Sequence, residues 1–208
     1  VADMVEQLSR EAPLLLALEV HAREHASLRA YLDGDGSPAQ RDVLRARPFW
    51  SVPAQDNDGR RSEDMLDLVE HVRQLRALGR DVAILPMDVA NGVSRGAHWR
   101  DRAMAAHLRR AYEALPRGLL LVLAGNMHAM RLRPDYAPPQ MPVPMGVDLQ
   151  DLRPLSVEIA AATGAFWACD AVCGPIPVRA VPPAGVQGDA SPFHYRIVLP
   201  RFTPARQV

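Results

Sequence analysis

Three apolar runs in this chain are each closely followed by a polar or titratable side chain. "LLLALEV" holds Glu19 near its end, "VAILPMDV" reaches Asp88, and "GLLLVLAG" is followed by Asn126 and His128. A carboxylate within an apolar run is seldom buried without a partner, and a histidine changes charge near neutral pH. Together these residue types could supply a general base, a proton donor or the ligands of a metal ion.

A second polar group lies in the segment "HWRDRAMAAH". Its pattern predicts a helix with Arg100 and Asp101 in the first turn, where the orphan backbone N–H groups favour anions. Arg100 could therefore stabilise negative charge that develops during a reaction. The alternative is a solvated first turn in which Asp101 only complements the helix dipole.

Other residues of this set also have a purely structural interpretation. Asp88 could cap the helix that follows its strand, and His128 could be a solvated loop residue. His21 directly follows the first apolar run and is a further candidate for contacting a ligand.

The spacing of apolar residues predicts alternating strands and helices. The helix over 62–80 has the clearest 3.6-residue period, with Ser62 as its N-cap and Gly79 as its C-cap. The same reasoning predicts further helices at the N-terminus and over 22–36, 37–50 and 98–118, and strands over 12–20, 81–89 and from 118 onwards.

Continuously apolar strands separated by helices indicate an α/β fold, with a mainly parallel sheet covered by helices on both faces. The carboxyl ends of parallel strands meet at one edge of the sheet. We therefore expect Glu19, Asp88, Arg100 and His128 to converge in one cleft.

The sequence changes character from residue 134. The stretch "PDYAPPQMPVPMG" is too rich in proline for regular structure, while 155–164 and 193–200 are expected to be strands. We expect this irregular, Pro/Gly-rich part to add edge strands to the same sheet, so that residues 1–208 form a single domain.

Composition excludes some classes of partner. The formal net charge of the 208 residues is zero, whereas a nucleic-acid-binding protein would usually have a basic excess. No apolar run reaches the roughly 18 to 20 residues of a transmembrane helix. We expect no nucleic-acid partner and no transmembrane segment, but a small-molecule or peptide ligand.

The chain has two cysteines, Cys169 and Cys173. Their separation is compatible with a small disulfide loop or with two free thiols, and a zinc site would need further Cys or His residues nearby. A disulfide would favour an exported, periplasmic location, whereas free thiols leave a cytoplasmic location open.

Several short motifs resemble those of one superfamily. "LALEV" with the downstream "YLDG", then "RDRAMAAHL" and "LVLAGNMHA", are similar in order and spacing to motifs of the superfamily that joins erythromycin esterase-like proteins, ChaN-like haem-binding proteins and the TraB/Tiki group. The resemblance covers roughly residues 10–132. It implies site roles for Glu19, Arg100, Asp101, Met104, Gly125 and His128.

The resemblance also implies a Gly-Glu-x-His motif at the end of a first strand. That motif would precede "VADMVEQLSR", which already has helical spacing. We therefore expect that the domain over 1–208 lacks its first strand and this motif. The ChaN-like group is exported, in agreement with the cysteine pair.

The first functional hypothesis is a hydrolase, either an esterase or a metal-dependent peptidase. Glu19 would act as a general base or bind a divalent metal together with His128, His128 would transfer protons, and Arg100 would stabilise negative charge. The remaining candidates would bind the ligand: Asp88, Asp101, Asn126 and His21.

Two other hypotheses follow from the resemblance. The chain could bind haem or a metal without turnover, with His128, Tyr136 or His21 as the axial ligand of haem iron. It could also be a non-catalytic domain whose site is degenerate.

Overall fold

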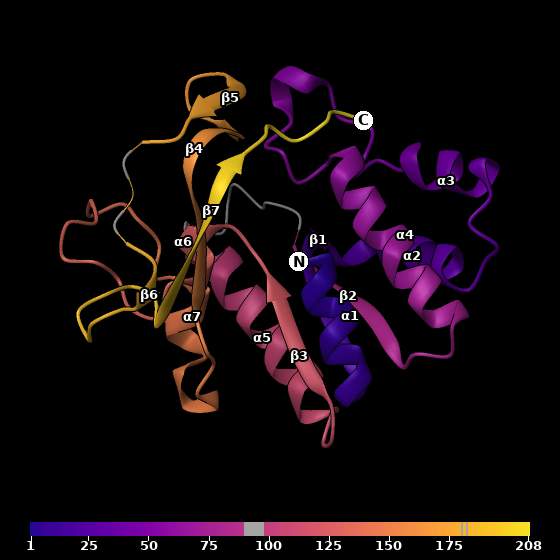
Figure 1. Ribbon diagram of the computed structural model, residues 1–208, viewed down its shortest axis with the longest axis horizontal. Coiled ribbons are helices and arrows are strands. Elements are labelled where there is room, and N and C mark those ends of the chain that lie inside the picture. Colours follow the sequence, from indigo (N-terminus) through magenta and orange to yellow (C-terminus); the bar gives the residue numbers. More distant parts are fainter. Residues whose placement is uncertain (90–97, 180, 182) are drawn as a thin grey trace.

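The computed structural model describes residues 1–89, 98–179, 181 and 183–208. At its centre is a parallel three-stranded sheet in the order β2–β1–β3 (Figure 1). The three predicted N-terminal strands are confirmed, with the bounds Leu14–His21 for β1, Val82–Asp88 for β2 and Leu119–Leu123 for β3.

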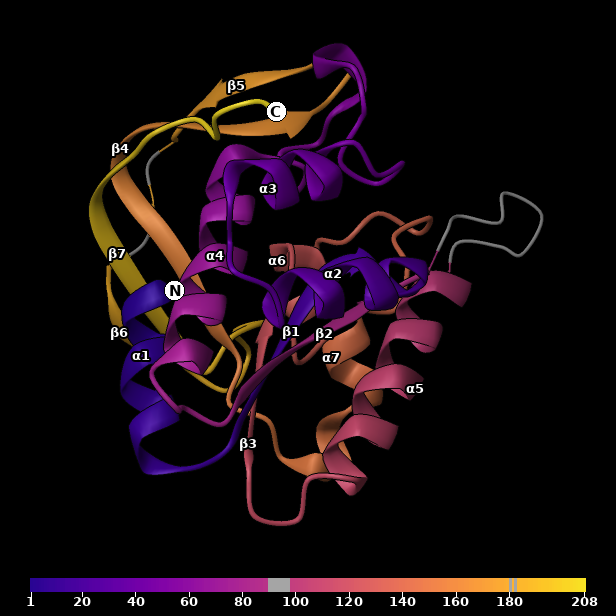
Figure 2. The same cartoon turned by 90° about the vertical axis from the view of Figure 1, so that its right-hand side faces the viewer.

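Helices cover both faces of this sheet, as expected. Leu14, Leu16 and Leu18 of β1 pack in one buried cluster with residues of α1, α2 and α4. Ala17 of the same strand packs in a second cluster, with residues of α5 and α7. Figure 2 shows α1 and α5 on opposite sides of β1. The bounds of these helices are Ala2–Glu11 for α1, His25–Leu32 for α2, Glu63–Ala77 for α4, Trp99–Glu113 for α5 and Met145–Asp148 for α7.

The alternation of side chains along β1 determines on which face of the sheet Glu19 lies. Successive side chains of a strand alternate between the faces of a sheet, so Glu19 shares a face with Ala17 rather than with Leu18. That face is the one covered by α5, the helix that carries Arg100 and Asp101.

Two helices begin at a serine cap, and both predicted caps of α4, Ser62 and Gly79, are confirmed. The Ser37 hydroxyl accepts a hydrogen bond from the backbone N–H of Gln40 at the start of α3 (Pro38–Arg45). The Ser62 hydroxyl accepts one from Met65 N–H at the start of α4. Gly79 follows α4 with a φ of 82°, a conformation that favours glycine.

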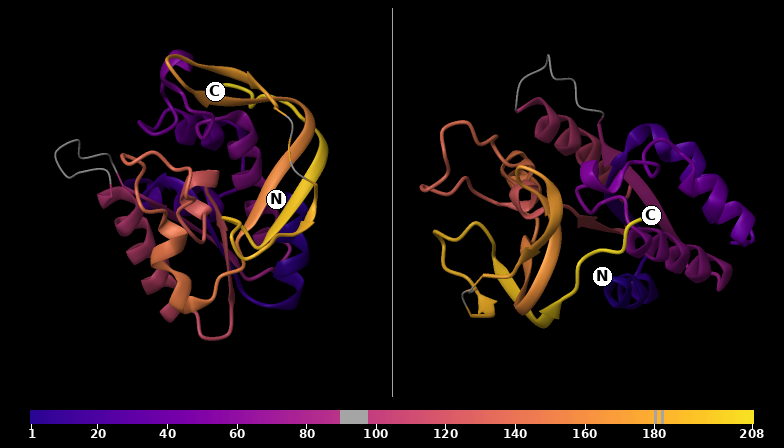
Figure 3. Two further views of the ribbon diagram at one scale, coloured as in Figure 1. Left: turned by 90° about the vertical axis from the view of Figure 1, so that its left-hand side faces the viewer. Right: turned by 90° about the horizontal axis from the view of Figure 1, so that it is seen from above.

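The C-terminal part forms a second sheet, so the expectation that it adds edge strands to the first sheet is wrong. The order of this mixed sheet is β5–β4–β7–β6, and Figure 3 shows its strands, in orange and yellow, as a separate curved layer. Its strands are β4 (Val157–Cys169), β5 (Cys173–Pro177), β6 (Gly185–Val186) and β7 (Tyr195–Phe202).

The route of the chain between the two sheets explains this difference. The stretch 134–144 contains no helix or strand, as predicted, but the last two residues of the predicted irregular stretch, Met145 and Gly146, begin the short helix α7. Met145 and Leu149 then pack against Met104 and Leu108 of α5. The chain is therefore held against α5 before β4 begins, and β4 pairs with β5 and β7 instead of with β3.

Cys169 and Cys173 form a disulfide, so the first of the two expected alternatives is observed. They are register partners at the end of the β4–β5 hairpin. Among the described residues, no helix is long and apolar enough to cross a membrane.

Candidate functional site

Glu19 lies near the carboxyl end of the central strand β1 and is buried. The backbone N–H of Gly125 donates to Glu19 Oε2 over 2.9 Å. Arg60 Nη1 donates to Glu19 Oε1 over 2.9 Å, and Arg100 Nη2 donates to the same oxygen. The carboxylate thus has the partners that a charged group needs inside a protein.

Asp88 ends the neighbouring strand β2 and is 1% exposed. Its Oδ1 accepts from Arg100 Nε over 2.8 Å, and its Oδ2 accepts from Arg60 Nη1 over 2.7 Å. Burial alone would raise the pKa of Asp88, but the two guanidinium groups outweigh it and hold that pKa below its usual value. Asp88 is therefore an ionised member of a buried ion-pair network rather than only a helix cap.

Arg100 is the centre of this network. Burial disfavours its charged form, yet the bonds to Asp88 and the charge of Glu19 raise its pKa above the ordinary value. Its Nη1 atom also lies 2.8 Å from His128 Nε2. All three guanidinium nitrogens are thus bonded to protein atoms.

Arg60 is a member of the network that the sequence patterns did not indicate. It belongs to the loop 57–61, directly before α4. Besides its bonds to the two buried carboxylates, it donates from Nε and Nη2 to Asp58 Oδ2 over 2.9 and 2.5 Å. Burial opposes its charge, but Asp58 and Glu19 raise its pKa. The one local signal was its place in "NDGRRS", directly before a capped helix.

His128 lies in α6 (Asn126–Ala129) and pairs with Asp101 of α5. The distance between His128 Nδ1 and Asp101 Oδ1 is 2.7 Å. Because a carboxylate only accepts hydrogen bonds, this contact places the ring proton on Nδ1. Nε2 is then the acceptor of the bond from Arg100, and it lies 3.6 Å from Glu19 Oε1.

Asp101 is buried and has a second partner. The backbone N–H of Met145 donates to Asp101 Oδ1 over 2.9 Å, so the start of α7 helps to hold the same oxygen that bonds His128. This geometry differs from a solvated first turn of a helix. Met104, one turn further along α5, lies in the apolar core.

His21 and Asn126 lie at the margin of this arrangement. His21 Nε2 is 4.0 Å from Asp88 Oδ2, and the ring packs edge-on against Phe49. Burial lowers the pKa of His21, although Asp88 acts in the opposite direction. Asn126 Nδ2 lies 3.5 Å from Glu158 Oε1 of β4 instead.

We call the convergent residues the site cluster: Glu19, Arg60, Asp88, Arg100, Asp101 and His128. The expected meeting of Glu19, Asp88, Arg100 and His128 is observed. The carboxylates form a buried floor, while the side chains of Arg60, Arg100 and His128 are 22%, 19% and 19% exposed. The accessible groups of the cluster are therefore two cations and an imidazole, which could bind an oxyanion and transfer a proton.

The site cluster does not fit a metal ion or haem. Among the described residues, no three His, Cys, Asp or Glu side chains are arranged to hold a metal. Glu19 Oε1 and both oxygens of Asp88 already accept from guanidinium groups, and Glu19 Oε2 accepts from the backbone N–H of Gly125. Both ring nitrogens of His128 are engaged as well. Tyr136, the other candidate axial ligand, is 81% exposed.

One solved structure has a similar fold: a histidine-to-asparagine mutant of the erythromycin esterase EreC in its open conformation. The match has a TM-score of 0.56 and 11% sequence identity, and it covers 90% of this chain and 80% of that chain. No protein-family model and no curated protein sequence matches the chain. The likeness concerns the fold, and the erythromycin esterase-like fold implied by the sequence motifs is confirmed.

Proposed function

We propose that this chain is a hydrolase that cleaves a carboxylic ester with water as the nucleophile. The observation that carries the proposal is the pair formed by Asp101 and His128, whose Nε2 atom lies beside Glu19 and Arg100. A histidine whose Nδ1–H is held by a carboxylate has its other nitrogen free to act as a base. The solved structure of similar fold is that of an esterase, which supports the choice of an ester.

The first step requires a change of partner at Arg100. In the structure its Nη1–H donates to His128 Nε2, so the lone pair of that nitrogen is occupied. A substrate carbonyl oxygen that accepts from Arg100 Nη1 would release Nε2, which could then accept a proton from water. Substrate binding and activation of the base are thereby coupled.

The bond changes then follow general acid–base catalysis. The water oxygen attacks the carbonyl carbon while its proton passes to His128 Nε2, and the carbonyl oxygen becomes an oxyanion next to Arg100. Asp101 stabilises the imidazolium that forms. When the carbon–oxygen bond of the ester breaks, the leaving alkoxide takes the proton from Nε2, so the products are a carboxylic acid and an alcohol.

Glu19, Asp88 and Arg60 have a supporting role in this scheme. The two carboxylates hold the guanidinium group of Arg100 from two sides, and Arg60 offsets part of their negative charge. Because the guanidinium group of Arg100 is already oriented, little reorganisation of the protein is needed when negative charge develops on the substrate.

The test is a panel of p-nitrophenyl esters, lactones and fluorogenic peptides, with His128→Ala compared with wild type. Loss of the base should lower kcat/KM for the ester by about 10²- to 10⁴-fold. His25→Ala is the matched control, because His25 is exposed at the start of α2 and is not a member of the site cluster. It should retain wild-type kinetics.

Other outcomes distinguish the remaining hypotheses. Cleavage of the peptides but of no ester would show that the substrate is a peptide rather than an ester. Equal ester hydrolysis by His128→Ala and wild type would exclude His128 as the base. No hydrolysis by the wild-type protein would favour a non-catalytic domain.

We also propose that the protein works in an oxidising compartment outside the cytoplasm. The disulfide between Cys169 and Cys173 supports this, because such bonds persist mainly in exported proteins. Alkylation of the denatured protein without prior reduction should label neither Cys169 nor Cys173, as read by mass spectrometry. Two free thiols would contradict the proposal.

A further inference from the structure

The loop 57–61, which brings Arg60 to the site cluster, is braced by the side chain of Asn57. Asn57 Nδ2 donates to the backbone carbonyl of Arg61 over 2.6 Å, and Gly59 N–H donates to Asn57 Oδ1 over 3.0 Å. Asn57 is 1% exposed. These bonds join the two ends of the loop, so that its backbone is held as one unit.

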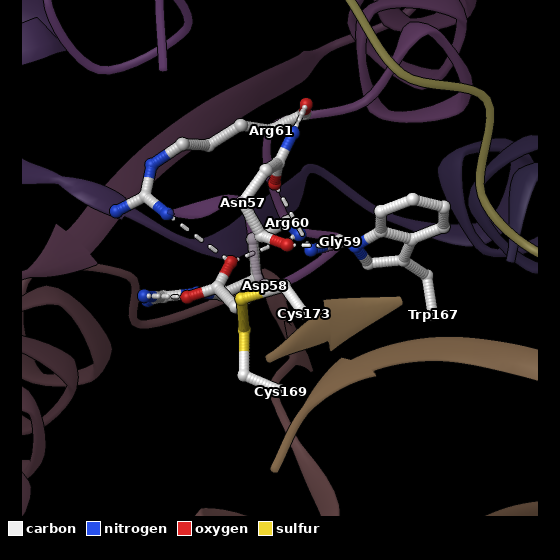
Figure 4. The surroundings of a disulfide bond; sticks show 8 residues. All are labelled: Asn57, Asp58, Gly59, Arg60, Arg61, Trp167, Cys169 and Cys173. Carbon is white, nitrogen blue, oxygen red and sulfur yellow. Dashed lines mark hydrogen bonds and ion pairs between the residues drawn. A yellow bond between two sulfur atoms is a disulfide. The ribbon is translucent and has the colours of Figure 1, made fainter. Parts of the chain in front are cut away.

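Trp167 of β4 anchors this unit to the second sheet. Its indole Nε1–H donates to the backbone carbonyl of Asn57 over 2.7 Å (Figure 4). The packing is close as well, because a Cβ atom added to Gly59 would lie 3.0 Å from the carbonyl oxygen of Trp167. Gly59 also has a φ of 90°, which a larger residue rarely adopts.

The hairpin that carries Trp167 is closed by a disulfide. Strand β5 is at the edge of the second sheet and pairs with β4. Two of its residues, Pro175 and Pro177, have no backbone N–H for the ladder. The bond between Cys169 and Cys173 closes the end of this weakly paired hairpin, and β5 also contacts η2 (Ala54–Asp56), which leads into the loop.

We propose that Trp167 is a positioning residue, which acts through the backbone of Asn57 to hold Arg60 against Glu19 and Asp88. The disulfide-closed hairpin provides the rigid support for this contact. The catalytic consequence rests on the proposed function, whereas the placement of Arg60 does not.

The placement can be measured without any substrate, from solvent exchange of the Arg60 Nη1–H groups, which donate to Glu19 and Asp88. Low-temperature NMR would follow the signals, assigned by their loss in Arg60→Lys. Trp167→Phe keeps an aromatic ring but removes the indole donor. Loss of one ordinary hydrogen bond should accelerate exchange at Arg60 by about fivefold. Phe166→Leu is the matched control, since Phe166 is the preceding residue of β4 and is 40% exposed, and it should leave exchange at Arg60 unchanged.

A second internal reference separates positioning from general loosening. Arg73 Nη2–H donates to Glu70 of the same helix, α4, and its exchange should not change in Trp167→Phe. Equal acceleration at Arg60 and Arg73 would overturn the proposal, as would unchanged exchange at Arg60.

The double variant Cys169→Ser/Cys173→Ser tests the hairpin without altering Trp167. It should accelerate exchange at Arg60 in the same way, and it provides the measurement if Trp167→Phe does not fold. If exchange at Arg60 were unchanged in this variant, the disulfide-closed hairpin would not be what holds Trp167 in place, and this part of the proposal would be wrong. If wild type hydrolyses esters, Trp167→Phe should lower kcat while KM changes little. If it hydrolyses none, the exchange data still decide where Arg60 is held.

Discussion

The Asp101 carboxylate and the His128 imidazole meet over 2.7 Å between Oδ1 and Nδ1, although α5 and α6 are separated in the chain by β3. The same carboxylate oxygen accepts from the backbone N–H of Met145 at the start of α7. Three elements that are separate in the sequence therefore set the orientation of one imidazole ring.

Asp101→Asn should lower ester kcat/KM by about 10²-fold or more. An asparagine amide can donate to His128 Nδ1 and would move the ring proton to Nε2, the nitrogen that must accept a proton from water. Kinetics would be measured together with ¹⁵N NMR of the imidazole, which identifies the tautomer. Wild-type activity with the proton on Nε2 would contradict the proposed role of His128.

Arg100→Met should lower the free energy of unfolding by about 3 kcal/mol or more, because it leaves buried carboxylates without their main partner. Urea denaturation followed by circular dichroism would measure this change. The control is Arg10→Met, which removes the half-exposed pair of Arg10 and Glu6 on α1 and should cost only about 0.5 kcal/mol. Similar losses in both variants would show that the network contributes little to stability.

Asp88 should make stability depend on pH in the acid range. The two arginines hold its folded-state pKa below the ordinary value of 3.8. Its contribution is therefore complete above the unfolded-state pKa of about 3.9 and is lost as pH falls through the folded-state pKa. Urea unfolding between pH 2 and 6 should show a steeper loss below about pH 4 in wild type than in Asp88→Asn. Identical pH profiles of stability in wild type and Asp88→Asn would contradict the lowered pKa of Asp88.

His21 should make the stability of the protein depend on pH in a different range from Asp88. Burial lowers its pKa below the ordinary value of 6.5, so the unfolded chain binds a proton more readily than the folded one. Stability should therefore fall as pH is lowered from about 6.5 towards the folded-state pKa. NMR titration of the ring would give that pKa directly, and His21→Gln should flatten the profile in this range. A His21 pKa at or above 6.5 would refute the prediction.

Much of the site cluster could be predicted because the relevant information is local. The apolar runs around Glu19 and Asp88 encode strands, and the period of the helices between them requires a parallel sheet. Parallel strands present their carboxyl ends at one edge, so the meeting of Glu19, Asp88, Arg100 and His128 followed from topology alone.

Arg60 and the second sheet were not predictable in the same way. The loop 57–61 has no hydrophobic period, and its position depends on Trp167, which lies 110 residues further along the chain. The strand expected over 155–164 is only the first part of β4, which continues to Cys169, and the pairing of β4 with β5 and β7 was not expected.

The sequence alone therefore determined the longer helices, the three parallel strands of the first sheet, and the carboxylates, arginine and histidine at the edge of that sheet. Hydrophobic period and capping are properties of neighbouring residues, so they can be read without knowing the fold. Only the tertiary structure decided that Arg60 joins the cluster, that Asn126 turns towards Glu158, and that the C-terminal strands form their own sheet. Each of these depends on which polar groups and strand edges meet after the core has packed, and that is a property of the whole chain.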